Sequence, residues 1–179
     1  GNSSYKDLPG SDWVKAALRY KGDFMVVLKG KSLWLGYASN DDDIFLFDNK
    51  SPETGCAAGR SAVCLDEEIV FLGWEDIYKF DGIDADSIGE TIRKEVFRTI
   101  KTEEIDRSFG VKLDEFMEYW LHVCSTRSSY CDVAWVLNRQ TGRFTFHRYA
   151  DYFTAHGLYQ LVAALKISDL TMKIGDMAW

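Results

Sequence analysis

The cysteine and histidine residues have the widest chemical range in this chain. A cysteine thiolate acts as a nucleophile when a histidine base lies beside it and an acid orients that base. Cys131, His147 and Asp151 can meet in this way if Cys131 begins a strand that pairs with residues 143–149. Cys56, which lies in a loop of small residues, is the other candidate nucleophile. The sequence therefore leaves open a small hydrolase or transferase that uses Cys131 or Cys56 with His147.

The spacing of the cysteines does not match a metal site. Zinc sites typically use tight C-x₂₋₄-C or H-x₃₋₅-H pairs, whereas the two local pairs here, Cys56 with Cys64 and Cys124 with Cys131, are wider. Such pairs suit disulfides in a secreted protein, and they equally suit buried thiols in a reduced one. We expect no metal and no cofactor. The thiol state stays open, with reduced thiols in the cytoplasm slightly favoured over a secreted protein.

An acidic stretch near the middle of the chain partly matches a calcium loop. Four residues occupy the first, third, sixth and twelfth places of an EF-hand loop: Asp84, Asp86, Gly89 and Glu95. The fifth place fails, because Ile88 has no side-chain oxygen. Residues 87–90 also match a capping box, which favours the start of a helix there instead of a loop.

Several common enzyme motifs are absent from the sequence. It contains no G-x-x-x-x-G-K-[ST], no G-x-G-x-x-G after an expected strand, no H-E-x-x-H and no G-x-S-x-G. Each of these motifs places specific groups around a phosphate, a dinucleotide, a zinc ion or an acyl group. Their absence argues against the common NTPases, dinucleotide-binding enzymes, zinc proteases and α/β-hydrolases.

Aromatic residues beside acidic turns indicate a binding surface. The chain has 6 tryptophans and 9 tyrosines, and alternate residues of a strand point outwards. Acidic groups around aromatic anchors would steer a basic partner and then hold it, although burial of the aromatics is the competing interpretation. The leading hypothesis is a non-catalytic protein-binding module, such as an inhibitor-like, immunity-like or accessory protein. Its expected contact residues are Trp34, Tyr37, Asp41, Asp42, Asp43, Trp74 and Glu75. A domain that binds an apolar ligand between sheet and helices is a further alternative.

A second, basic face is expected near the C-terminal hairpin. It consists of four arginines: Arg127, Arg139, Arg143 and Arg148. Arginines with aromatic residues on a sheet bind single-stranded nucleic acid or proteins. The net charge of −7 disfavours nucleic acid and anionic membranes, and pairing of the arginines with nearby acids is the competing interpretation. Two faces of opposite charge also suit a self-complementary contact between copies, so a homo-oligomer stays open.

The elements that must position these residues follow both helical and strand patterns. Strands are expected at residues 24–28, 33–37, 44–47, 69–72, 77–80, 133–137 and 143–149. Helices are expected at residues 11–18, 88–100, 101–110, 113–124 and 158–165. The pattern of residues 113–124 is the clearest, with apolar residues at i, i+3, i+4, i+7, i+8 and i+11. Because short turns join antiparallel strands, we predict an α+β fold. It has a mostly antiparallel sheet, from an N-terminal meander and a C-terminal hairpin, with helices packed on one side.

Length and composition predict one globular domain. The chain has 179 residues and is 46% hydrophobic, which is too apolar for a disordered protein. We expect residues 1–9 to form a flexible end and residues 10–179 to form one α+β domain. No apolar run approaches the roughly 20 residues that span a bilayer, so we expect no membrane partner. No signal peptide is visible, and the chain begins at Gly1, so a leader can have been removed.

Overall fold

A computed structural model describes residues 7–39 and 45–155 of the chain. These residues form twelve strands in three four-stranded antiparallel sheets, and within each sheet the strands follow chain order. The first sheet contains β1 (Val14–Tyr20), β2 (Phe24–Lys29), β3 (Leu33–Ala38) and β4 (Phe45–Ser51). The second contains β5 (Val63–Leu65), β6 (Glu68–Leu72), β7 (Ile77–Phe80) and β8 (Ala85–Ser87). The third contains β9 (Phe109–Leu113), β10 (Glu118–Cys124), β11 (Cys131–Asn138) and β12 (Arg143–Phe153).

Helical structure is short in the described part of the chain. It consists of α1 (Arg93–Thr99) and the 3₁₀ turns η1 (Gly59–Ser61), η2 (Thr102–Arg107) and η3 (Asp114–Phe116). Val96 of α1 and Ile105 of η2 pack into a core shared by the second and third sheets. Among the described residues, no helix combines the length and the apolar character needed to cross a bilayer.

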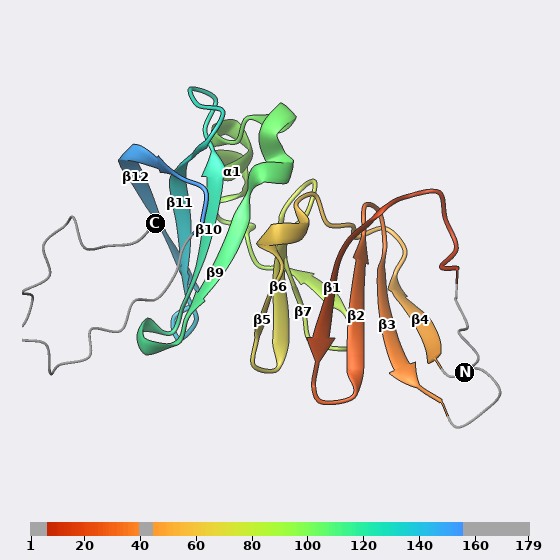
Figure 1. Ribbon diagram of the computed structural model, residues 1–179. Coiled ribbons are helices and arrows are strands. Elements are labelled where there is room, and N and C mark those ends of the chain that lie inside the picture. Colours follow the sequence, from red (N-terminus) through yellow and green to blue (C-terminus); the bar gives the residue numbers. More distant parts are fainter. Residues whose placement is uncertain (1–6, 40–44, 156–179) are drawn as a thin grey trace, which may run out of the picture.

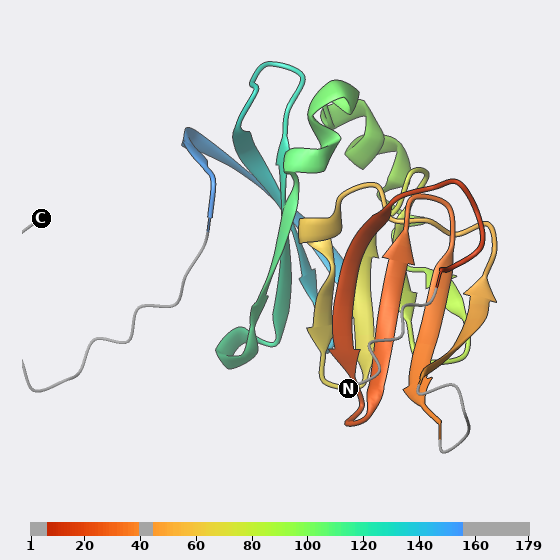
Figure 2. The same ribbon diagram turned by 45° about the vertical axis from the view of Figure 1, so that its right-hand side comes forward.

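The second sheet lies between the other two, so the fold is a stack of three layers (Figure 1; Figure 2). Successive residues of β6 point to opposite faces of the sheet. Ile69 and Phe71 pack toward the first sheet, and Val70 and Leu72 toward the third. All four side chains are fully buried. Burial on both faces explains why this strand is a continuous apolar run instead of an alternating one.

The prediction of an α+β fold with helices on one side of a sheet was wrong. Residues 113–124, expected to be the clearest helix, form the end of β9, the turn η3 and strand β10. The reason is burial on both faces. Leu121 and Val123 enter the core between the sheets, while His122 is covered by aromatic rings on the opposite face. A strand of this kind is apolar at successive positions, and its residues can match a helical spacing by coincidence.

Two other expected helices are also absent or displaced. Residues 11–18 lead into and form most of β1. Ser87 ends β8 and donates its hydroxyl hydrogen to Asp76 at 2.6 Å, so it does not cap a helix. The helix α1 begins only at Arg93, and its cap residue Ile92 makes no side-chain hydrogen bond. The helix expected at residues 158–165 lies outside the described residues.

The expected strands are confirmed. Residues 24–28, 33–37, 69–72, 77–80, 133–137 and 143–149 all lie in strands. Of the strand expected at 44–47, residues 45–47 lie in β4, and Ile44 lies outside the described residues. The expected helical piece at 101–110 is confirmed only as the 3₁₀ turn η2. Short turns therefore predicted these strands correctly, whereas three-to-four periodicity failed on β10, which is buried on both faces, and on the more exposed β1.

Strand β12 forms the outer edge of the third sheet and is irregular. It pairs residue by residue with β11 from Arg143 to Arg148. The register then shifts, and the next paired residue is Phe153, opposite Cys131. Residues 149–152 thus bulge out of the ladder, and the bulge divides the long edge strand into a regular run and a single terminal pair.

Candidate functional site

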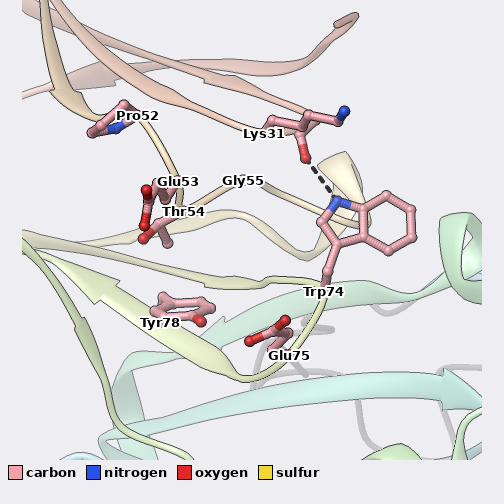
Figure 3. A pocket seen from close by; sticks show the side chains of 9 residues that line it. Lys31, Pro52, Glu53, Thr54, Gly55, Trp74, Glu75 and Tyr78 are labelled. Carbon is pink, nitrogen blue, oxygen red and sulfur yellow. Dashed lines mark hydrogen bonds between the residues drawn. The ribbon is translucent and has the colours of Figure 1, made fainter.

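A cavity of about 510 Å³ opens where the first and second sheets meet (Figure 3). Three segments line it: the turn between β2 and β3, the loop after β4, and the turn between β6 and β7 with the start of β7. The lining residues are Gly30, Lys31, Pro52, Glu53, Thr54, Gly55, Trp74, Glu75 and Tyr78. The site thus combines two aromatic rings with two carboxylates and one ammonium group.

Trp74 is held in a defined orientation at the rim of the cavity. Its side chain is 47% exposed, yet its Nε1–H donates a 2.7 Å hydrogen bond to the carbonyl oxygen of Gly30 (Figure 3). The ammonium of Lys15 lies 5.9 Å from the centre of the Trp74 ring and also pairs with Asp106 at 2.7 Å. A large exposed ring with a fixed orientation loses little conformational entropy when a ligand binds.

Two glycines allow the lining segments to approach one another. A Cβ atom on Gly55 would lie 2.1 Å from the carbonyl oxygen of Gly30, and one on Gly73 would lie 2.5 Å from the Tyr78 ring. Both distances are far shorter than any stable contact. The backbone of the loop after β4 therefore packs directly on the β2–β3 turn, and the N–H of Cys56 donates to the carbonyl of Lys29 at 2.9 Å.

A buried ion pair supports the β2–β3 turn from behind. The Lys29 ammonium lies 3.0 Å from a carboxylate oxygen of Asp12, and it also donates to the carbonyls of Pro9 and Gly10. The other oxygen of Asp12 accepts a 2.8 Å hydrogen bond from the N–H of Lys31. Burial raises the pKa of Asp12, but the hydrogen bonds from Lys29 and Lys31 outweigh it and leave this pKa below its ordinary value.

The cavity favours positively charged groups. The carboxylates of Glu53 and Glu75 outnumber the single ammonium of Lys31. Burial raises the pKa of the Tyr78 hydroxyl, and the charges of Asp76 and Glu75 raise it further. Carboxylates beside Trp and Tyr rings are the arrangement that attracts ammonium and guanidinium groups, through both charge and cation–π contact.

The structure separates the residues that were expected to form the acidic binding surface. Trp74 and Glu75 line the cavity. Trp34 is only 8% exposed, and its Nε1–H donates to the hydroxyl of Ser32. Tyr37 is half-buried and lies with its ring 6.3 Å from that of Phe24. The three expected acidic residues of the next turn, Asp41, Asp42 and Asp43, lie outside the described residues.

The four arginines of the expected basic face have different environments. The Arg139 guanidinium lies 2.6 Å from Asp66 and 3.5 Å from Asp114, so acids of the chain neutralise it. Arg127, Arg143 and Arg148 are exposed. Arg148 lies 5.7 Å from the ring of Phe146 on the same strand.

Asp66 links the second sheet to the third. Its carboxylate accepts hydrogen bonds from Lys112 at 2.7 Å and from Arg139 at 2.6 Å. These two hydrogen bonds lower the pKa of Asp66 to about 2. The carboxylate is therefore an anchor between sheets and remains charged over the whole neutral and mildly acidic range.

The residues of the expected cysteine–histidine site do not converge in the described structure. Cys131 begins β11, which pairs with β12 as expected, but Cys131 lies opposite Phe153 while His147 lies opposite Ala134. The sulfur of Cys131 lies 3.6 Å from that of Cys124 and donates to the carbonyl of Arg107. His147 instead stacks on the ring of Trp120, with 5.4 Å between centres. In the described part of the chain, no hydrogen bond or ion pair joins Asp151 to either residue.

The second candidate nucleophile, Cys56, is fully buried. Burial raises the pKa of its thiol to about 12, and the thiol donates a hydrogen bond to the carbonyl of Ala58. A nucleophilic cysteine needs the opposite shift, since the thiolate is the reactive form.

The partial calcium pattern falls on regular structure. The stretch from Asp84 to Glu95 contains β8 and the first turn of α1 instead of a continuous loop. Within residues 7–39 and 45–155, no group of three or more Asp, Glu, His or Cys side chains is arranged to hold a metal ion.

Sequence reasoning missed most of the cavity. Glu53, Thr54, Gly55 and Tyr78 were not expected to contribute, because they meet Trp74 only through the packing of the first sheet on the second. The one available signal was the long loop at residues 49–61, with Pro52 and Gly55, since long loops in compact domains are often functional.

No model of a known protein family matches the chain, and a search of curated proteins also finds no match. The residues of the cavity therefore carry the functional argument alone.

Proposed function

We propose that this protein is a non-catalytic protein-binding module whose contact surface is centred on the cavity beside Trp74. The observation that supports this most strongly is Trp74 itself. It is half exposed and fixed by a hydrogen bond, at the rim of a cavity that also contains Glu53 and Glu75. Tryptophan is enriched among the residues that dominate protein interfaces, where it fills a pocket or frames one.

The charge of the site favours a partner segment that presents lysine or arginine. The chain carries a net charge of −7, which steers basic partners toward it. Once bound, a cationic side chain between the Trp74 and Tyr78 rings would pair with Glu53 or Glu75. A cation–π contact contributes about 0.5–2 kcal/mol, depending on how far it is desolvated. Lys15 already lies near the Trp74 ring, and its charge is balanced by Asp106.

Short peptides of defined charge provide a direct test. The isotope-labelled protein is titrated with a lysine-rich peptide, an arginine-rich peptide and a glutamate-rich peptide of equal length, and the tryptophan indole N–H signals are followed by NMR. We expect the basic peptides to shift the Trp74 signal, with an affinity that falls as salt increases. Replacing Trp74→Ala should weaken binding about tenfold or more, which corresponds to about 1.4 kcal/mol.

Variants on another sheet are matched controls. Phe116→Ala removes a ring that is 60% exposed, and Glu115→Gln removes an exposed charge beside it, both in the turn between β9 and β10. The combined change Glu53→Gln and Glu75→Gln should weaken binding, while these controls should not. Equal affinity of the Trp74→Ala variant and the wild type, or stronger binding of the acidic peptide, would contradict the proposal.

A further inference from the structure

Cys124 and Cys131 face each other across the pair of strands β10 and β11. They are register partners, and their sulfur atoms lie 3.6 Å apart. Both are buried in a small cluster that also contains Phe109 and half-buried Phe153. Directly opposed residues of antiparallel strands have Cα atoms about 4.5–5.5 Å apart, which lies inside the range of about 4.4–6.8 Å found for disulfides.

The other local pair, Cys56 and Cys64, does not have this geometry. Both pair with the same stretch of chain, but Cys56 lies opposite Gly73 and Cys64 opposite Ile69. Four residues of a strand span about 13 Å, whereas a disulfide requires Cα atoms within about 7 Å. Their thiols instead donate to the carbonyls of Ala58 and Asp66. Of the two cysteine pairs suggested by spacing, the fold brings only one together.

We propose that Cys124 and Cys131 form a site of oxidative modification, at which a low-molecular-weight disulfide of the glutathione type converts the two thiols into a cross-strand disulfide. The bond requires the sulfur atoms to approach from 3.6 Å to about 2.05 Å. Rotation of the two side chains supplies this movement, because the backbones already lie in register. The bond would cross-link β10 to β11 in the third sheet.

The exchange balances in two steps. One cysteine loses its proton, and its thiolate attacks a sulfur of the small disulfide, breaking that S–S bond and releasing one small thiol. The second cysteine then attacks the protein sulfur of the mixed disulfide and releases the second small thiol. The two cysteines are oxidised, and one small disulfide is reduced to two thiols that take up the two protons.

The rate of this reaction is set by access to the sulfurs. The exposed fractions of Cys124 and Cys131 are 0% and 3%, and burial raises the pKa of both thiols. Few thiolates are therefore present in the closed protein, and exchange proceeds when the strand ends open. The oxidised form, once made, is protected from reductants by the same burial.

The disulfide would close the loop of residues 125–130. This loop is already ordered by Asp132, whose carboxylate accepts hydrogen bonds from the N–H and the hydroxyl of Ser125. It carries Arg127 and Tyr130 on the surface. The modification would therefore fix the base of a loop that carries Arg127, far in the chain from Trp74. The proposed disulfide does not depend on the proposed binding function.

Thiol counting by mass spectrometry tests the proposal. The reduced protein is incubated with oxidised and reduced glutathione, both in its native state and during refolding from urea, and the free thiols are then alkylated under denaturing conditions, so that buried thiols are counted too. The wild type, Cys56→Ser and Cys64→Ser should each lose two alkylatable thiols and yield a digest peptide that links Cys124 to Cys131. The variants Cys124→Ser and Cys131→Ser should yield no linked peptide. The melting temperature of the wild type should rise by roughly 5–10 °C on oxidation.

Two results would overturn the proposal. One is a wild type that retains four alkylatable thiols after refolding in the oxidising mixture. The other is a linked peptide that contains Cys56 or Cys64 instead of the expected pair. The conclusion does not depend on the folding of the Cys124 and Cys131 variants, since the wild type and the Cys56→Ser variant alone distinguish these results.

Discussion

The substitution Asp12→Asn should strongly destabilise the protein and loosen the cavity. The Lys29 side chain is 3% exposed and that of Asp12 is 14% exposed, so the change leaves a buried ammonium without its counter-charge. Breaking a buried ion pair by removing one partner costs about 3–5 kcal/mol. We expect a value near 3 kcal/mol, because Lys29 keeps its hydrogen bonds to the carbonyls of Pro9 and Gly10, and such bonds to a charged group contribute about 1.5–3 kcal/mol each.

The effect should reach Trp74 through the backbone. Lys29 is followed by Gly30, whose carbonyl accepts the Trp74 indole hydrogen bond, and the N–H of Lys31 donates to Asp12. The asparagine oxygen can still accept from Lys31, but the turn loses its anchor to Lys29. The indole N–H resonance of Trp74 should therefore shift, and this hydrogen should exchange with solvent faster.

Urea denaturation at neutral pH measures the free energy of unfolding. The nearby exposed change Asp7→Asn is the matched control and should lie within about 0.5 kcal/mol of the wild type. The double variant Asp12→Asn, Lys29→Met should be more stable than Asp12→Asn alone, because no unpaired charge remains. A loss below about 1 kcal/mol for Asp12→Asn, or a double variant less stable than the single one, would refute this reasoning.

Two further predictions concern titration and thiol reactivity. The folded-state pKa of Asp66 is about 2, below its ordinary value of 3.8, because Lys112 and Arg139 stabilise the charged form. The contribution of Asp66 to stability is therefore present above pH 3.8 and is lost as the pH falls toward 2. The urea midpoint of the wild type should fall over this pH range, and the midpoint of Asp66→Asn should fall less. In the reduced native protein at pH 8, the half-buried Cys64 should be alkylated first. Cys56, with a pKa of about 12, should react about a thousand times more slowly than an ordinary thiol. Rapid alkylation of Cys56 in the folded protein would show that this thiol is not buried.

The strands were predictable because their turns are local. The acidic and glycine turns around residues 21–23, 30–32 and 138–142 end one strand and begin the next within a few residues. The number of layers was not predictable, because the apolar run of β6 looks the same whether one sheet or two pack on it. The period-two signal disappears in a strand with two buried faces, and in β10 it was replaced by an apparent helical period.

The two tryptophans of the expected binding surface show how far sequence reasoning reaches for the site. Both were expected to face outwards, on or beside a strand, although Trp34 is flanked by two leucines and Trp74 by Gly73 and Glu75. Trp34 lies within β3, where its ring is buried, whereas Trp74 follows β6 in a turn and stays half exposed. Exposure here depends on which sheet covers the residue. That depends on contacts between residues more than 40 positions apart, such as Trp74 with Gly30.

The irregular edge of the third sheet affects how the protein behaves at high concentration. A long, regular edge strand is a template on which further strands can add, and this is a common route to aggregation. In β12 only residues 143–148 keep a regular register before the bulge. If a second copy paired antiparallel with this edge, only residues 143–148 could form a regular ladder, and a short regular edge is a poor template for such addition. The bulge therefore discourages sheet-to-sheet polymerisation, while the cavity between the first and second sheets stays open to other molecules.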